Sequence, residues 1–179
     1  MLRTKDILDE KDPRVRAKNT DVDFPLNDEY KDIIPEMLKH LRYSQIEKLS
    51  KKYDLRPGMG LAAPQLGINK NFFVVCYEVK DGVFDDYILI NPKVISYSEE
   101  MIYAGEGEGC LSVNREVEGI VPRHARITVE AYDLDGNKRK YRVREDLAIA
   151  FQHELDHLNG ILFVDRINKN NPFEIVENS

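Results

Sequence analysis

The chain has 179 residues, of which 42% are hydrophobic and 32% charged, and its formal net charge is −6. This length and composition predict a single globular domain spanning 1–179 and argue against a disordered chain. The negative net charge argues against strong nucleic-acid binding through the phosphate backbone.

The sequence carries no sign of export or membrane insertion. The first residues, MLRTKDILDEKD, lack an apolar signal-peptide core, and no stretch approaches the ~18 apolar residues of a membrane span. We therefore expect a cytoplasmic protein that does not contact a membrane. The two cysteines, Cys76 and Cys110, are expected to be free thiols, or in one case a metal ligand, rather than a disulfide.

The first half of the chain predicts one long helix. Residues up to about Pro25 are polar, and we expect them to wrap the surface with one short helical turn. From Asn27, apolar residues recur at helical spacing through 27–53. Asn27 is a suitable N-cap, and Pro35 predicts a kink or a late start.

The second half predicts strands followed by one helix. Three segments rich in β-branched and aromatic residues predict strands at 72–79, 87–95 and 127–134. A turn at Asp135, Gly136 and Asn137 leads into 138–144, the returning arm of a hairpin. Apolar spacing predicts a helix over 144–159, with Gly160 at its C-terminal cap. The fold class is therefore α+β.

The late helix carries the sequence HELDH. His153 and His157 lie four residues apart, so both imidazoles can face one metal ion. Glu154 can take a proton from a metal-bound water. A histidine pair on a helix is often surface chemistry, but the inserted glutamate and apolar flanks favour a metal site. Asp156 either accepts the outer N–H of a ligand histidine or is a solvated carboxylate.

A third ligand is needed, because catalytic sites of this kind take three protein ligands plus water. The acidic residues downstream, Asp165, Glu174 and Glu177, have no helical spacing to the histidines. Upstream lies Cys110, where the preceding glycine permits close backbone approach and the thiolate is a strong ligand. The alternative for this cysteine is a small buried hydrophobe.

Three segments together resemble the motifs of the peptide deformylases: GMGLAAPQ at 58–65, EGCLS at 108–112 and HELDH at 153–157. They occur in the family's order, and the resemblance extends to about Ile167. The chain length and motif spacing resemble the longer, type 2 form of Gram-positive bacteria. The resemblance implies that Cys110, His153 and His157 are the metal ligands. It also implies antiparallel or mixed sheets packed around a central metal-binding helix, with an additional long helix in the N-terminal half.

The resemblance implies an enzyme of bacterial protein biosynthesis. It would remove the N-formyl group from the initiator formyl-methionine of nascent polypeptides, releasing formate. Fe(II) is the implied physiological metal, with nickel, cobalt or zinc able to occupy the same site. A metal-bound hydroxide would be the nucleophile and Glu154 the general base and acid. The Gln65 amide and the Leu111 N–H would stabilise the oxyanion.

The resemblance also assigns substrate contacts and supporting residues. Met59 and Gly60 would line the substrate channel, and Gly109 would touch the substrate backbone. Gly58, like Gly60, has no Cβ and lets the loop lie close to the substrate.

Two further pairs of residues are expected near the metal ligands. Ile149 and Ala150, one turn before His153, either form the methionine pocket or belong to the core. The resemblance implies that Glu108 and Arg123 form a buried pair behind the metal loop, the segment 106–113 that contains Cys110.

Two other function classes fit the sequence less well. A metallopeptidase that cleaves internal bonds is disfavoured, because the cysteine precedes the histidine pair and no downstream ligand is evident. A binding module with a structural metal would normally need four protein ligands.

The expected partners are formylmethionyl nascent peptides. We also expect a monomer that contacts the ribosome transiently. The polar tail containing Pro172 argues against a docking helix at the C-terminus. The basic segment 138–144 either substitutes for it or is a solvated hairpin arm.

Overall fold

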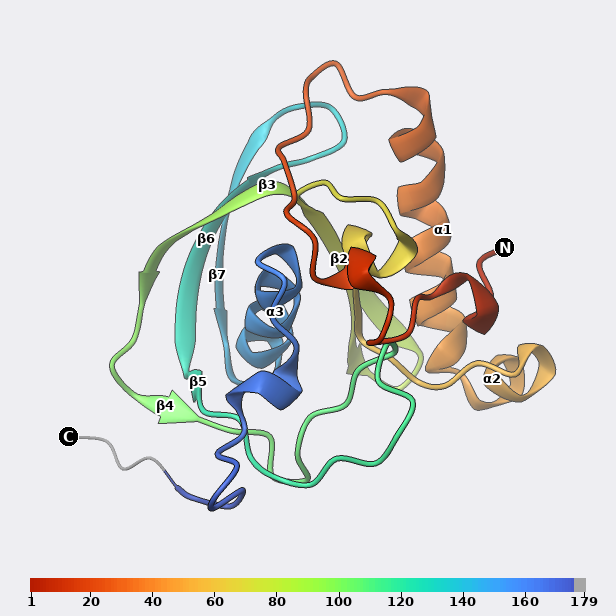
Figure 1. Ribbon diagram of the computed structural model, residues 1–179. Helices are drawn as coiled ribbons and strands as arrows, with labels where there is room; N and C mark the ends of the chain where they lie inside the picture. Colours follow the sequence, from red (N-terminus) through yellow and green to blue (C-terminus); the bar gives the residue numbers. More distant parts are fainter. Residues whose placement is uncertain (176–179) are drawn as a thin grey trace.

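The computed structural model describes residues 1–175 and is built on a five-stranded antiparallel sheet of order β1-β2-β3-β6-β7 (Figure 1). The strands are β1 Gly60–Ala62, β2 Phe72–Lys80, β3 Val83–Tyr97, β6 Arg126–Tyr132 and β7 Lys138–Arg144. Strands β4 (Met101–Ile102) and β5 (Arg123–His124) form a separate two-stranded ladder.

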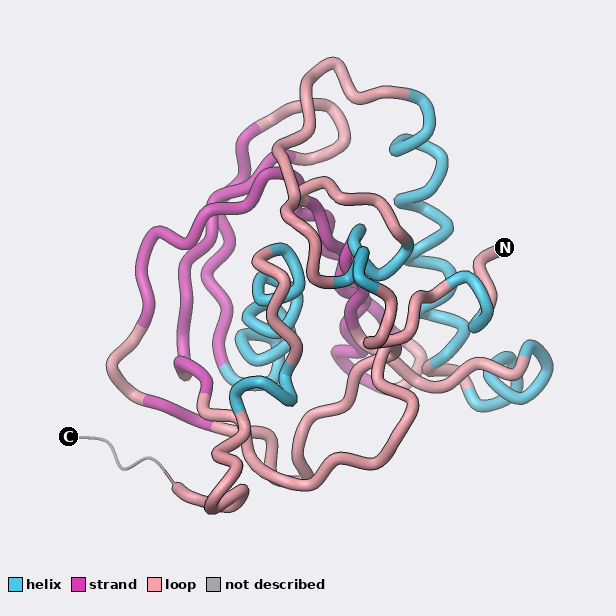
Figure 2. The backbone as a smooth tube through the Cα atoms, in the orientation of Figure 1, coloured by secondary structure: helices cyan, strands magenta, loops and turns pink. Residues whose placement is uncertain are grey.

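Residues 1–175 contain three α-helices: two pack against this sheet, and a short one contacts the first helix. They are α1 Asp28–Ser44, α2 Glu47–Tyr53 and α3 Glu145–Leu158. Figures 1 and 2 show α3 in the hollow of the curved sheet, with α1 beyond β2 on the opposite side. The α+β architecture predicted above is confirmed, with the sheet wrapped around the helix that carries the HELDH sequence.

Strand β2 lies between two hydrophobic cores, which explains why it reads as a continuous apolar run. Phe72, Val74 and Cys76 belong to the core formed with α1. Phe73 and Val75 point to the other face and pack into the core formed with α3. All five are fully buried, as expected for a strand whose alternating side chains meet a helix on both faces.

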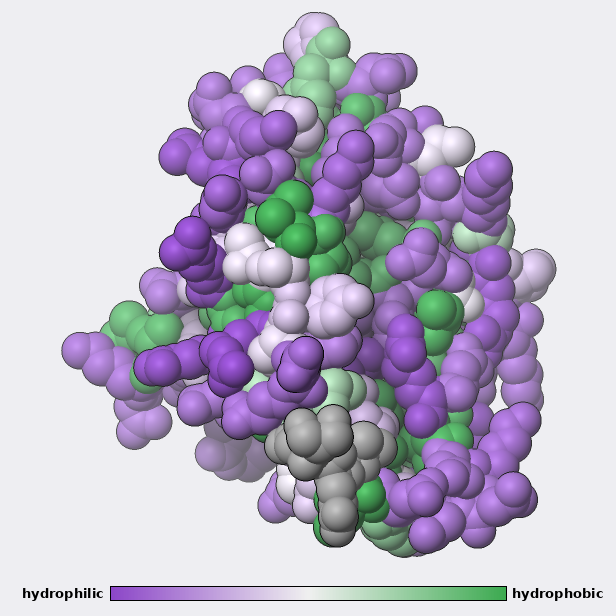
Figure 3. Space-filling view, turned by 90° about the vertical axis from the view of Figure 1, so that its left-hand side faces the viewer, coloured by the Kyte–Doolittle hydropathy of each residue, from purple (hydrophilic) through white to green (hydrophobic). Residues whose placement is uncertain are grey.

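The outer face of the sheet is different. In β6, Ile127, Val129 and Ala131 pack inward toward α3, whereas the residues between them are partly exposed. Most of the neighbouring β7 is exposed on this side of the molecule. Figure 3 views this side, where hydrophilic side chains dominate and apolar ones show between them. One buried and one solvated face is the usual arrangement of an antiparallel sheet.

The N-terminal segment differs from expectation. It contains two 3₁₀ turns, Thr4–Asp6 and Pro13–Val15, rather than one. It also sends apolar anchors inward, because Val15, Val22 and Leu26 are buried. These residues are too widely spaced to form a periodic pattern, so the sequence indicated only a polar surface segment.

The early helix also differs from expectation, because the helical region is broken in two. Helix α1 begins at the predicted position, because the Asn27 side chain caps it by accepting a hydrogen bond from the Tyr30 N–H at 3.2 Å. The helix continues through Pro35. It ends at Ser44, and Gln45 then donates from its side chain to the Cys76 carbonyl at 2.9 Å. The break therefore falls where the chain attaches to β2, a contact between residues far apart in the sequence.

Strand β3 is longer than predicted and bends at Asn91, where the register with β6 shifts. Asn91 has a positive φ of 52°, a conformation that asparagine tolerates better than most residues. Its side chain bonds both the N–H and the carbonyl of Val22, at 2.8 and 2.9 Å. The bend lets the sheet curve around α3. Among residues 1–175, no helix has the length and apolarity to cross a membrane.

Candidate active site

Helix α3 and the loop between β4 and β5 bring three candidate metal ligands together. The ligand atoms of Cys110, His153 and His157 all lie within 4.8 Å of one another. The Cys110 Sγ atom is 3.3 Å from His157 Nε2. Both histidines are buried, because the side of α3 that bears them faces the molecule's interior.

One of the histidines is oriented by a carboxylate. The Nδ1 atom of His153 lies 2.9 Å from Glu108 Oε1. A carboxylate only accepts, so Nδ1 carries the proton and Nε2 is the nitrogen left for a metal. Glu108 in turn receives two hydrogen bonds from Arg123, at 2.9 and 2.8 Å, and both side chains are almost fully buried.

Asp156 follows neither of its two sequence alternatives. It is 7% exposed, so it is not a solvated carboxylate, and it does not bond a ligand histidine. It binds Arg123 at 2.6 Å and Arg166 at 2.5 and 2.7 Å. The Nδ1–H of the candidate ligand His153 goes to Glu108 instead, and Asp156 pairs with Arg123, the arginine that also binds Glu108.

The buried charges shift the pKa values of these groups. Burial alone would raise the pKa of the Glu108 carboxyl, but hydrogen bonds from His153 and Arg123 hold it below its ordinary value. Burial works against protonation of His153, yet its hydrogen bonds to Cys110 and Glu108 raise its pKa. Burial and the neighbouring His153 lower the pKa of His157. The site thus favours an anionic Glu108 and a neutral His157.

Two buried polar atoms of the site, Glu154 Oε1 and His157 Nδ1, have no hydrogen-bond partner within residues 1–175. Glu154 is 3% exposed. Burial raises the pKa of its carboxyl to about 7. A carboxylate buried without a partner favours either a proton or a nearby cation.

The backbone of Gly60, the first residue of β1, lies directly against the Glu154 carboxylate. An added Cβ at Gly60 would lie 2.5 Å from Glu154 Oε2. Only a glycine therefore lets the β1 backbone approach this closely.

Gln65 and Leu111 lie beside the cysteine. Gln65, in the 3₁₀ turn Ala63–Leu66, is 1% exposed. Its Oε1 accepts from the Ala62 N–H at 2.9 Å, while its Nε2 donates to Ser112 Oγ at 3.0 Å and lies 3.5 Å from Cys110 Sγ. The amide is therefore held with its donor end toward Cys110, one of the candidate metal ligands.

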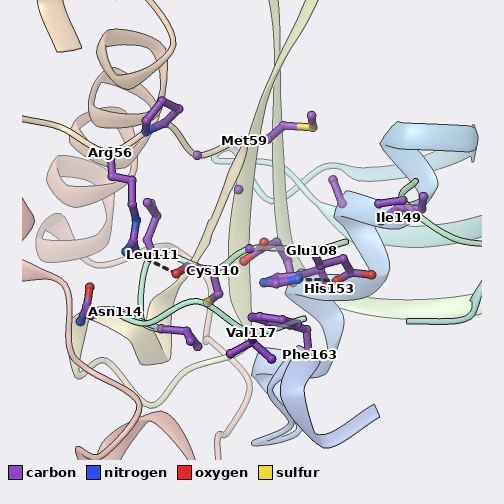
Figure 4. A pocket seen from close by; sticks show the side chains of 18 of the residues that line it. Arg56, Met59, Glu108, Cys110, Leu111, Asn114, Val117, Ile149, His153 and Phe163 are labelled. Atoms are coloured by element: carbon purple, nitrogen blue, oxygen red, sulfur yellow. Dashed lines mark hydrogen bonds and ion pairs between the residues drawn. The ribbon is translucent and has the colours of Figure 1, made fainter. Parts of the chain in front are cut away.

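A cavity of about 890 Å³ opens above these residues (Figure 4). Its wall contains Cys110, Leu111, His153 and Glu154, whereas Gln65 and His157 are not among its lining residues. All six residues predicted to contact substrate line the cavity: Gly58, Met59, Gly60, Gly109, Ile149 and Ala150. Ile149 is 8% exposed, and it belongs to the cavity wall as well as the buried interior.

Three residues with contacts in the site were not singled out from the sequence. Ser112 accepts from the Gln65 amide, and Arg166 binds Asp156. Arg56 donates to the Cys110 carbonyl at 2.7 Å. Arg56 directly precedes the 57–60 loop, which is the only local signal for its role; the other two contacts depend on the tertiary fold. Glu177, one of the downstream acids considered above, lies outside the described residues.

The donor set fits a divalent transition metal. One thiol and two imidazoles are the ligand types that bind Zn²⁺, Fe²⁺, Co²⁺ and Ni²⁺. The unpartnered Glu154 carboxylate gives a second reason for a cation here. Three protein ligands beside an open cavity leave a coordination position for water or substrate, as in catalytic sites.

Comparison with known proteins gives one consistent result. The family model described as "Polypeptide deformylase" matches residues 4–173. A curated "Peptide deformylase" of Oceanobacillus iheyensis is 48% identical over 179 residues, covering 100% of this chain and 98% of that protein. "Peptide deformylase 2" of Bacillus anthracis is 47% identical, covering 100% of this chain and 97% of that protein. The crystal structure of a probable peptide deformylase from Synechococcus phage S-SSM7 matches with a TM-score of 0.74 and 34% identity, covering 89% of this chain and 97% of that one.

Proposed function

The chain belongs to the peptide deformylase family of enzymes, and from that premise we propose a metal-dependent hydrolysis in which Glu154 moves the proton. The substrate is the N-formyl group of formyl-methionyl nascent peptides, and the products are formate and a free amino terminus. One observation carries the proposal: the buried Glu154 carboxylate, which has an oxygen without a hydrogen-bond partner among residues 1–175, lies next to a Cys-His-His group at the wall of a cavity.

Cys110, His153 and His157 hold the metal in this proposal. The family resemblance implies Fe(II), and nickel, cobalt and zinc suit the same donors. When bound, the cation supplies Lewis acidity that makes water a nucleophile near neutral pH. Glu108 keeps His153 in the tautomer that leaves Nε2 free for the ion.

Glu154 acts as the general base and then the general acid. Its carboxylate takes a proton from the attacking water and returns it to the leaving amine. Burial raises its pKa to about 7, and a neighbouring cation favours the carboxylate form. The contact with the Gly60 backbone limits where the carboxylate can move.

Gln65 and Leu111 stabilise the oxyanion that forms on the formyl oxygen. The Gln65 Nε2 lies on the cysteine side of the site, and the Leu111 N–H belongs to the residue after the ligand cysteine. Both are fixed donors in a largely buried site, where hydrogen bonds to developing charge count most.

The formyl-methionyl peptide lies in the cavity. Gly58, Met59 and Gly60 line one wall and Gly109 lies on the metal-loop side, where its missing Cβ permits backbone contact. Ile149 is an apolar surface for the methionine side chain, as is its neighbour Ala150.

We also propose that the protein works as a cytoplasmic monomer that meets nascent chains during transient ribosome contact. The described part of the tail, 167–175, contains no helix, so a C-terminal helix in that range is not the contact. Sedimentation with and without purified ribosomes tests both statements. A dimer, or no cosedimentation at low salt, would contradict them.

The direct test is formate release from formyl-Met-Ala by protein purified without oxygen and reconstituted with Fe(II). The control variant is Glu154→Gln, which keeps the shape of the side chain but cannot accept the proton. We expect release by the wild type, and loss of release by the variant at equal metal content. An active Glu154→Gln variant would exclude the role proposed for Glu154, and no release by the loaded wild type would exclude the reaction.

A further inference from the structure

The Arg56 guanidinium donates a hydrogen bond to a backbone carbonyl rather than to a carboxylate. Its Nη2 donates to the carbonyl of Cys110 at 2.7 Å (Figure 4). Within residues 1–175 this guanidinium forms no ion pair with a carboxylate, although acidic side chains line the same cavity. A charged donor on a carbonyl makes a stronger hydrogen bond than a neutral one.

The bonded carbonyl belongs to the same peptide unit as the Leu111 N–H. A trans peptide is planar, so its carbonyl and its N–H point in opposite directions. The Cys110 carbonyl also accepts from the Val113 N–H at 3.0 Å. Two donors on the carbonyl therefore fix the direction of the N–H on the other side. That N–H donates to no acceptor in the described chain.

The backbone before and after Arg56 is hydrogen-bonded to two helices. On one side, Ser50 Oγ of α2 donates to the Leu55 carbonyl at 2.6 Å. On the other, the Gly58 N–H donates at 3.1 Å to Ser44 Oγ, at the end of α1. The two helices thus anchor the segment that delivers the guanidinium to the metal loop.

We propose that Arg56 is a positioning residue that aims the Leu111 N–H at the reacting oxygen of the substrate. This inference rests on the proposed function. In Figure 4, Arg56 reaches the Cys110 carbonyl from one side of the loop, while His153 lies on the other. The hydrogen bond to the carbonyl also polarises the amide, and this strengthens its N–H as a donor. Without Arg56, the Val113 N–H would be the one remaining donor to this carbonyl within residues 1–175.

A direct role in substrate binding is the competing explanation, because Arg56 also lines the cavity. The two roles differ in kinetics. A group that binds the peptide chain changes KM, and more for longer peptides. A group that orients an oxyanion donor changes kcat, and equally for short and long peptides.

The kinetic test compares Arg56→Ala and Arg56→Lys with the wild type on formyl-Met-Ala and on a longer formyl peptide of the same start. Arg142→Ala, an exposed arginine on β7, is the matched control for loss of charge. We expect Arg56→Ala to lower kcat roughly 10- to 100-fold on both substrates with KM nearly unchanged, less than the ~10²–10³ of deleting a donor. Arg56→Lys should recover part of the loss, and Arg142→Ala should match the wild type.

A second readout does not depend on activity. In the Zn(II)-loaded protein, the amide resonance of Leu111 and the carbonyl-carbon resonance of Cys110 are compared by NMR. We expect both to shift in Arg56→Ala and neither to shift in Arg142→Ala. Unchanged kcat, a change in KM alone, or an unmoved Leu111 resonance would overturn the positioning role. If the loaded wild type releases no formate, the proposed reaction is wrong, and the NMR comparison still tests the contact.

Discussion

The Nδ1 atom of His153 lies 2.9 Å from a carboxylate oxygen of Glu108, and Glu108 is bound through both oxygens to Arg123. This contact selects the tautomer of a candidate ligand. We predict that Glu108→Gln lowers metal affinity roughly 10- to 100-fold, the usual cost of removing such a partner. Competition with a chelator measures the affinity. Glu106→Gln, an exposed carboxylate in the same loop, is the control; equal affinities in the two variants would contradict the prediction.

Gln65 carries a separate prediction. Gln65→Leu should lower kcat roughly 100- to 1,000-fold, because one oxyanion donor is lost, while metal content stays at the wild-type level. The variant should also lose about 1–3 kcal/mol of unfolding free energy, since the Ala62 N–H loses its acceptor. Ser112→Ala keeps the Gln65 amide and removes only the hydroxyl to which it donates, so kcat should fall much less in this variant. Similar losses in both variants would show that Gln65 acts only through packing.

A methyl group at Gly60 should disable the site without touching a metal ligand. The added Cβ would lie 2.5 Å from Glu154 Oε2 and 2.8 Å from its Cδ, so the carboxylate must move. We predict that Gly60→Ala loses most of its formate release and keeps its metal. Gly105→Ala is the matched control, because nothing lies within 4 Å of the added Cβ there. A Gly60→Ala enzyme as active as Gly105→Ala would mean that the position of Glu154 matters little.

The pair Arg16–Asp165 predicts a pH dependence of stability. Its two hydrogen bonds measure 2.8 and 3.0 Å, and the hydrogen bond from Arg16 lowers the pKa of Asp165 below 3.8. A depressed folded-state pKa contributes stability that is present above the unfolded pKa, about 3.9, and is lost as pH falls through the folded value.

Asp165→Asn removes that titration and supplies the reference. Both partners are more than a third exposed, so the difference in unfolding free energy at pH 7 should be only about 1 kcal/mol or less. Urea unfolding at several pH values measures it. The difference should shrink as pH falls below about 4; a difference that grows there would have the wrong sign.

Much of the fold could be predicted because local pattern and tertiary structure agree. The apolar segments that predicted α3, β2 and β6 are also the segments that bury apolar side chains in the core. The mostly exposed β7 was predictable from the turn before it. The misses depend on contacts between distant residues. The early helix is interrupted at Gln45, whose side chain bonds the Cys76 carbonyl. Strand β3 bends at Asn91, whose side chain bonds the backbone of Val22.

The candidate site shows the same division. The residues inside the three motifs could be named from their types and order. The two partners of Asp156 could not be named in this way, because Arg123 and Arg166 lie next to it only in the folded chain. Arg56 was missed for a related reason: its role comes from a bond to a backbone carbonyl, and backbone acceptors leave no mark in the sequence.

The most direct measurement is a titration of metal-free protein with Fe(II) under exclusion of oxygen, following formate release from formyl-Met-Ala. The account predicts no release without metal and a rise that stops at one ion per chain. Cys110→Ser should weaken this binding, because it replaces the thiolate. Release by metal-free protein, or an unchanged titration in Cys110→Ser, would contradict the metal-dependent mechanism.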